Sequence, residues 1–147
     1  MEKEELLKSI NNALFDLSLN IHEEFGGVYQ DIPERYRFVI ILISKYKTLY
    51  VKDLADLLHV SSSSVSQLLS KMEKERYIVR ELDPGKRRQT FVKLGVEGEK
   101  ILRKMTETRN KISSKYLIKL SYNDLVSFHQ IALRIKEIVE SEREAAE

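Results

Sequence analysis

Cysteine and tryptophan are absent from this chain of 147 residues, and glycine and proline are scarce, with five and two copies. Without cysteine the chain has no disulfide, no thiolate metal site and no cysteine redox switch. Few helix breakers, together with many Leu, Ile, Lys and Glu residues, predict a mainly helical protein. The length suits one domain, or one compact unit made of two coupled parts.

Long apolar runs and the common catalytic motifs are also missing. The longest apolar run, Phe38–Ile43, is far too short to cross a bilayer. The acidic, amphipathic first residues do not resemble a signal peptide, so we expect a cytoplasmic protein with no membrane partner. The sequence lacks GxSxG, GxxxxGKS/T and HExxH. We therefore expect a protein that is not an enzyme and has no cofactor and no metal site.

Positive charge is concentrated in the middle of the chain, although the net charge is only +2. Residues 45–93 carry 11 basic and 6 acidic side chains, whereas residues 1–44 carry 4 basic and 8 acidic ones. A basic internal segment is typical of a module that binds a polyanion, such as nucleic acid. A solvated surface that is locally basic would give the same count, so charge alone does not decide.

The spacing of apolar residues predicts helices in most of the chain. Ser61 and Ser121 are the expected N-caps of two of them, and His59 is expected to take a left-handed turn conformation. Two strands, Tyr77–Leu82 and Gln89–Leu94, flank a turn signalled by a Pro-Gly pair. The expected helices cover residues 2–25, 33–45, 51–58 and 96–120, and two more begin at Ser61 and Ser121.

The helix that begins at Ser61 has an unusual number of small hydroxyl side chains. Packing through Val65, Leu69 and Met72 turns serines outward, where they let a backbone approach closely and donate to phosphates. Gln67 carries the paired donor and acceptor that can recognise adenine. The other explanation of a serine run is a helix cap or a flexible loop. The candidate DNA-binding residues on this helix are Ser61, Ser62, Ser63, Ser64, Ser66, Gln67, Lys71 and Lys74.

The predicted hairpin carries a second group of candidate DNA-binding residues at its tip. Lys86, Arg87 and Arg88 stand beside Gln89. A turn that presents two arginines suits a narrow, electronegative minor groove. Solvated charge on a loop is the alternative, but like charges crowded at one tip repel and imply a counter-anion.

Taken together, residues 54–100 resemble the winged helix-turn-helix of the MarR family of transcriptional regulators. The matching motifs are Leu-Ala-x-x-Leu, a Val-Ser turn, Ser-Val-Ser-x-Leu-Leu, and Asp-Pro-x-x-Arg-Arg in the wing. The resemblance covers about a third of the chain by motif and nearly all of it by the order of helices.

The resemblance implies a mainly α fold with a small β-wing, in which a winged helix-turn-helix joins a helical dimerisation platform. The expected domains are an N-terminal dimerisation helix (1–32), the DNA-binding domain (33–95) and C-terminal dimerisation helices (96–147). The implied function is a homodimeric repressor that binds double-stranded operator DNA at two half-sites. Many members are released from DNA by a small aromatic ligand. The main alternative is a winged helix that binds another protein and not DNA.

Three points depart from the family pattern or stay open. Lys86 stands where the family usually has an acid that braces the arginines, so either Asp83 takes over the bracing or the wing is more mobile. Gly95 replaces the usual Ser or Thr, so we expect a poorly capped helix start. Tyr36, Arg37 and Tyr46 are conceivable ligand-lining residues, but aromatic residues at helical spacing are more often core.

Overall fold

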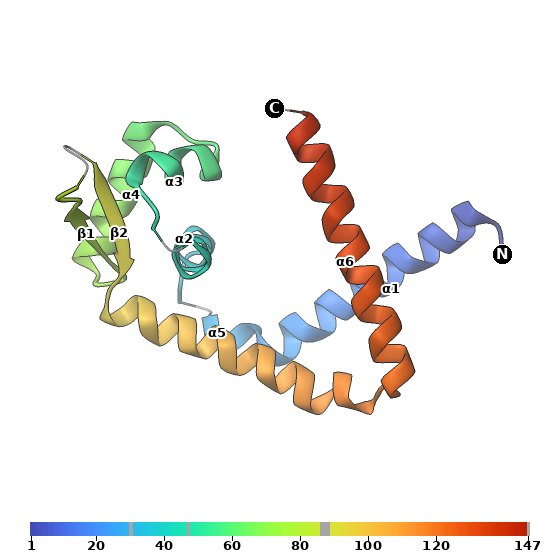
Figure 1. The fold of residues 1–147 in the computed structure, drawn as a ribbon. Coiled ribbons are helices and arrows are strands. Elements are labelled where there is room, and N and C mark those ends of the chain that lie inside the picture. Colours follow the sequence, from blue (N-terminus) through green and yellow to red (C-terminus); the bar gives the residue numbers. More distant parts are fainter. Residues whose placement is uncertain (30, 47, 86–88, 147) are drawn as a thin grey trace. The chain divides into compact units, whose positions relative to one another are not determined.

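In the computed structural model of the chain, residues 1–29, 31–46, 48–85 and 89–146 are described. Helices dominate, and one two-stranded antiparallel sheet interrupts them (Figure 1), which confirms the predicted mainly α fold with a small β-wing. No helix of the described residues is long and apolar enough to cross a membrane. The elements are α1 (Lys3–Phe25), a 3-10 turn (Gly26–Tyr29), α2 (Glu34–Lys45), α3 (Val51–Leu58), α4 (Ser62–Lys74), β1 (Ile78–Leu82), β2 (Thr90–Leu94), α5 (Val96–Lys115), a second 3-10 turn (Leu117–Lys119) and α6 (Tyr122–Ala145).

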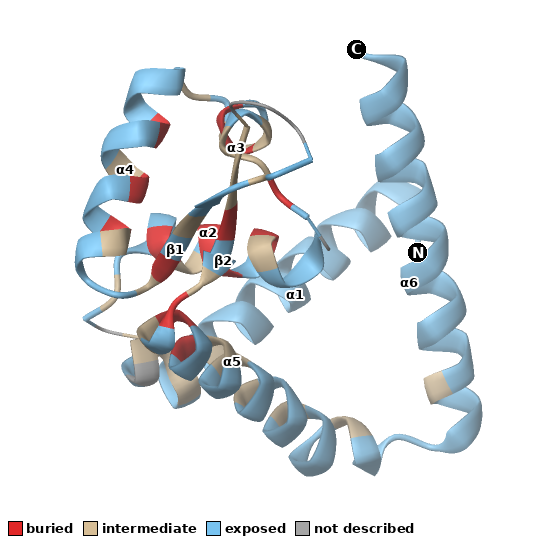
Figure 2. Ribbon diagram, turned by 60° about the vertical axis from the view of Figure 1, so that its left-hand side comes forward, coloured by how far each residue is buried: buried red, intermediate tan, exposed pale blue. Residues whose placement is uncertain are grey.

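The chain divides into two compact units, Met1–Met105 and Thr106–Glu147. The hydrophobic core belongs to the first unit, and Figure 2 shows its buried residues gathered on α2, α3, α4, the two strands and the start of α5. Helical spacing accounts for this, because each of these helices turns one apolar stripe inward. The buried core residues are Tyr36, Val39, Ile40, Leu42, Leu49, Leu54, Ala55, Val65, Leu69, Met72, Ile78, Val92 and Ile101.

Helices α3 and α4 form a helix-turn-helix whose sharp turn depends on one left-handed residue. His59 has φ 55° and ψ 42°, as the sequence predicted. The N–H of Val60 donates to the carbonyl of Ala55 (3.1 Å), and that of His59 donates to Asp56 (3.2 Å). These two bonds form a Schellman-type end that uses carbonyls the last turn of α3 would otherwise leave unpaired.

The wing is a short hairpin braced by the segment before α3. Strands β1 and β2 pair from Ile78 opposite Leu94 to Leu82 opposite Thr90, one residue shorter at each predicted start. The stretch that precedes α3 contacts β2 through one isolated β-bridge. Its Tyr50 forms an antiparallel bridge with Phe91, and the Val92 N–H donates to the Leu49 carbonyl at 2.9 Å. This fixes the wing against the start of α3.

The start of α5 packs backbone to backbone against the turn after α4, and here a prediction was wrong. The Glu97 N–H donates to the Arg76 carbonyl (3.0 Å), and the Gly95 N–H donates to the Tyr77 carbonyl (2.9 Å). The helix start therefore has hydrogen-bond partners without a Ser or Thr cap. A Cβ on Gly95 would lie 2.5 Å from the Arg76 oxygen, so glycine is needed there for close approach.

Two smaller boundaries also differ from the predicted ones. Pro33 is the N-cap of α2 and not its first residue, so the helix begins one residue later. Helix α5 ends at Lys115 instead of continuing to about Leu120. The physical reason is that Ser121 caps α6 from an extended conformation, and Leu120 before it is extended as well, so the chain has to leave the helix earlier.

Candidate nucleic-acid interface

Helix α4 presents one polar face to solvent. Its buried side is Val65, Leu69 and Met72, with Leu68 partly buried beside them, and the polar positions face outward by helical geometry. All eight candidate positions on or beside this helix are exposed: Ser61, Ser62, Ser63, Ser64, Ser66, Gln67, Lys71 and Lys74. No large apolar side chain is exposed on α4, which distinguishes it from a helix that binds a partner through hydrophobic contacts.

Part of the serine run forms the N-cap of α4. The Ser61 hydroxyl accepts from the Ser64 N–H at 3.2 Å and donates to the Ser64 hydroxyl at 2.9 Å. The Ser63 hydroxyl oxygen lies 3.2 Å from the Ser61 hydroxyl oxygen. Ser61 and Ser64 therefore stabilise the helix start, whereas Ser62 and Ser66 lie at the edge of a groove and are better placed to contact a ligand.

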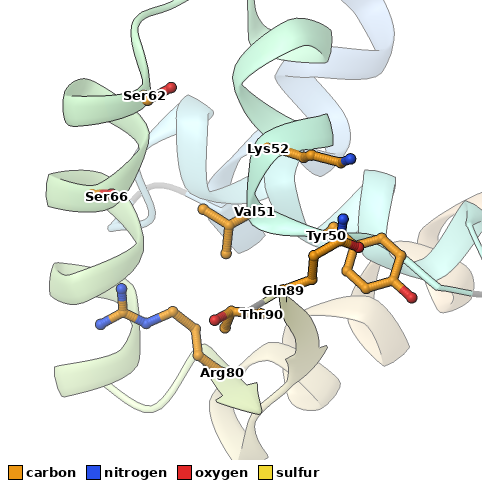
Figure 3. Close-up of a pocket in the computed structure, with 8 residues that line it drawn as sticks. All are labelled: Tyr50, Val51, Lys52, Ser62, Ser66, Arg80, Gln89 and Thr90. Carbon is orange, nitrogen blue, oxygen red and sulfur yellow. The ribbon is translucent and has the colours of Figure 1, made fainter. Parts of the chain in front are cut away.

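That groove, of about 460 Å³, lies between α3, α4 and the wing strands. In Figure 3 Val51, at the start of α3, lies in the space beside α4, and the Arg80 side chain extends toward α4. The Oε1 atom of Gln89 is buried and has no hydrogen-bond partner among the described residues. The groove is lined by Tyr50, Val51, Lys52, Ser62, Ser66, Arg80, Gln89 and Thr90.

Of the candidate residues, Ser62, Ser66 and Gln89 are thus brought together, and Lys71 and Lys74 lie further along the exposed face of α4. Sequence analysis did not single out Lys52, Arg80 or Tyr50, which line the same groove. Arg80 lies within the predicted strand Tyr77–Leu82, and nothing in the sequence marked it as a residue of the site. The predicted contacts Lys86, Arg87 and Arg88 lie outside the described residues.

Arg80 ties the wing to α4. Its Nη2 donates to Glu73 Oε1 at 3.1 Å and to the Ser70 hydroxyl at 3.2 Å, and its backbone N–H donates to Glu73 Oε2 at 3.0 Å. These hydrogen bonds from Arg80 hold the pKa of the Glu73 carboxyl below its usual range. The pair also neutralises an acid that would otherwise repel phosphates from this face.

A second set of hydrogen bonds connects the distal end of the wing to the residue before α3. The Tyr50 hydroxyl donates to Asp83 Oδ2 at 2.6 Å, and the Gly85 N–H donates to Asp83 Oδ1 at 2.9 Å. The bond to Asp83 raises the pKa of the Tyr50 phenol, because it stabilises the protonated form beside a carboxylate. Asp83 therefore joins the turn of the wing to the N-terminus of α3.

The conceivable ligand-lining residues differ in their surroundings. Tyr36 is a core residue that donates to Glu75 Oε1 at 3.1 Å and packs edge-on against Tyr77. Its burial, more than the bond to Glu75, raises its pKa to about 12. Tyr46 is exposed, whereas Arg37 lies over the Tyr29 ring and lines a hollow of about 520 Å³ at the end of α1.

The fold and this polar face define a winged helix-turn-helix protein. Residues 31–89 match the family model described as MarR family. This match covers the helix-turn-helix and β1, and it supports the predicted resemblance to the MarR family of winged helix-turn-helix transcriptional regulators. Because this family consists of regulators, the prediction that the chain is not an enzyme is confirmed.

Relatives resemble the chain over nearly its whole length. It is 21% identical to the transcriptional repressor MdtR of Bacillus subtilis over 145 residues, which cover 92% of this chain and 94% of MdtR. A MarR-like regulator of Thermotoga maritima has a TM-score of 0.75 at 22% identity, covering 95% of this chain and 98% of its own. FabT of Streptococcus pneumoniae, solved in complex with DNA, has a TM-score of 0.75 at 19% identity, covering 92% of this chain and 98% of FabT. These structural similarities establish a common fold.

Proposed function

We propose that the chain is a homodimeric transcriptional repressor that binds a pseudo-palindromic DNA operator through α4 and the wing. The observation that carries the proposal is the face of α4, where Ser62, Ser66 and Gln67 are exposed beside a groove that the wing closes. Hydroxyl and amide groups of this kind contact phosphates and base edges in the major groove. The DNA complex of FabT, which has the same fold, supports the assignment.

Homodimer formation rests on the exposed apolar faces of the terminal helices. None of the described residues of α1 or α6 is buried, although both helices carry large apolar side chains. On α1, Leu14 and Phe15 are 58% and 64% exposed, and on α6 Phe128 and Ile138 are 56% and 58% exposed. Apolar surface on this scale marks an interface. A two-fold dimer would place two copies of α4 about 10 bp apart on the duplex.

We further propose that a small aromatic ligand releases the protein from DNA. The hollow beside Arg37 offers space, and the Nε atom of Arg37 is buried without a hydrogen-bond partner among the residues that the structure describes. An aromatic carboxylate could supply that partner. We expect such acids to raise the melting temperature of the wild-type protein and to weaken its binding to DNA, and an R37A variant to lose both responses.

The test of DNA binding is a salt titration on genomic duplexes selected by the protein from its source organism. Fluorescence anisotropy should give an affinity that falls with a log–log slope of about −0.9 for each phosphate contact. K71A should make the slope shallower by about two, because each protomer loses one contact. The matched control is K100A at the start of α5, which should leave the slope unchanged.

The contribution of Gln67 to base recognition is tested by the same assay. Q67A should lose about 1–3 kcal/mol of discrimination between the selected duplex and one with changed base pairs, while non-specific binding stays the same. Failure of the wild-type protein to enrich any duplex, or an affinity that does not depend on salt, would contradict the proposal and favour a protein-binding module.

A further inference from the structure

Tyr50 connects three parts of the winged helix-turn-helix. It is the N-cap of α3, where its N–H donates to Asp53 Oδ2 at 3.2 Å and its carbonyl accepts from the Leu54 N–H at 3.2 Å. It forms the antiparallel bridge with Phe91 of β2. Its side chain lines the groove between α4 and the wing. A change at Tyr50 can therefore reach α3, the wing and the groove.

The hydroxyl of Tyr50 contacts the wing where the hairpin turns. Its partner Asp83 is the first residue after β1, and the Asp83 N–H donates to the Gln89 carbonyl at 2.9 Å, which closes the ladder. The other carboxylate oxygen accepts from the Gly85 N–H at 2.9 Å and so shapes the turn. The phenol thus binds the carboxylate that organises the wing turn.

This end of the wing has little apolar packing to hold it. Leu82, the last residue of β1, is 72% exposed, and Glu81 beside it is exposed as well. A two-stranded ribbon without further contacts is marginally stable in water. Near its core end the hairpin is tied down by Arg80 and by Ile78, which is buried. At the distal end, a direct hydrogen bond of 2.6 Å between Tyr50 and Asp83 supplies the tie.

We propose that Tyr50 is a positioning residue of the DNA interface, which sets the orientation of the wing relative to α4 through its hydrogen bond to Asp83. The inference rests on the proposed function, since wing orientation matters only if the wing and α4 contact one duplex. The inference also concerns the family pattern, in which an acid usually stands at the position of Lys86. In this wing the nearby acid is Asp83, and it accepts a hydrogen bond from Tyr50 at the start of α3. Tyr50 itself need not touch DNA.

The test compares Y50F with wild type on the selected duplex, at several salt concentrations. Y50F removes one hydroxyl and keeps the ring that packs in the groove. Loss of one hydrogen bond should weaken binding about three- to tenfold. The salt slope should become shallower by about one or more, because a misdirected wing contacts fewer phosphates. Thermal melting by circular dichroism checks that the variant is folded, and the control is Y46F, which changes an exposed tyrosine at the end of α2 and should bind like wild type.

A double-mutant cycle separates positioning from general destabilisation. D83A should weaken binding at least as much as Y50F, and adding Y50F to D83A should cause no further loss, because both changes break one connection. Wild-type affinity and slope in Y50F, or losses that simply add in the double variant, would overturn the proposal. Failure of wild type to bind any duplex would instead contradict the proposed function, and the positioning role with it.

Discussion

Replacement of Gly98 by alanine tests the backbone contact between α5 and the turn after α4. A Cβ at this position would lie 2.1 Å from the carbonyl oxygen of Tyr77 and 3.1 Å from its carbon. Both atoms belong to the backbone, so no side chain can rotate away, and the two backbones have to separate by more than about 1 Å to reach an ordinary contact. The Gly95 and Glu97 hydrogen bonds to the same turn, at 2.9 and 3.0 Å, would be stretched by that movement.

Two contributions lower the stability of G98A and one raises it. Overpacking costs about 1–3 kcal/mol, and weakening of two hydrogen bonds adds about 1 kcal/mol. Alanine is favoured over glycine inside a helix by about 1 kcal/mol, which offsets part of this. We therefore expect G98A to lower the free energy of unfolding by about 2 kcal/mol, and the melting temperature by about 4–8 °C.

Urea denaturation followed by circular dichroism, at one fixed protein concentration, measures this change. The matched control is G27A, because a Cβ on Gly27 would meet nothing within 4 Å and none of the described glycines has a positive φ. G27A should be neutral or slightly stabilising. A G98A protein as stable as wild type would refute the argument from close approach.

Two further changes test local contacts of α4. S61A should lower the free energy of unfolding by about 0.5–2 kcal/mol in urea denaturation, because the Ser64 N–H loses its cap, whereas the exposed S66A should leave stability unchanged. Arg80 lowers the pKa of Glu73, so their pair contributes stability above the usual value of 4.5 and loses it as the pH falls through the lowered pKa. Because both side chains are partly exposed, we expect E73Q to lower the free energy of unfolding by at most about 1 kcal/mol at pH 7. The difference in the free energy of unfolding between pH 7 and pH 3 should be smaller for E73Q than for wild type. An unchanged difference would contradict this.

Features set by local sequence were predictable. The Ser61 and Ser121 caps, the left-handed His59 and the strand pair around the wing all depend on side chains and backbone within a few residues. The exposed face of α4 followed in the same way from the spacing of its apolar residues. These are the features that define the helix-turn-helix and the polar face of the candidate site.

Features that depend on tertiary approach could not be predicted. Gly95 was interpreted as a missing cap, but it is needed because the backbone of residues 76 and 77 lies against it. Tyr50 and Arg80 entered the candidate site only when the structure showed their partners, Asp83 and Glu73, which are 33 and seven residues away in sequence. No periodicity reports such pairs, because each member alone is an ordinary polar residue.

The exposed apolar side chains of α1 and α6 have a consequence for dosage. Burying one large apolar side chain contributes about 1.5–3 kcal/mol, so covering several such residues in the proposed dimer would couple folding to chain concentration by mass action. At low expression such dimers would be scarce, and operator occupancy would rise with about the square of the amount of protein made. A regulator built this way would respond steeply to its own rate of synthesis.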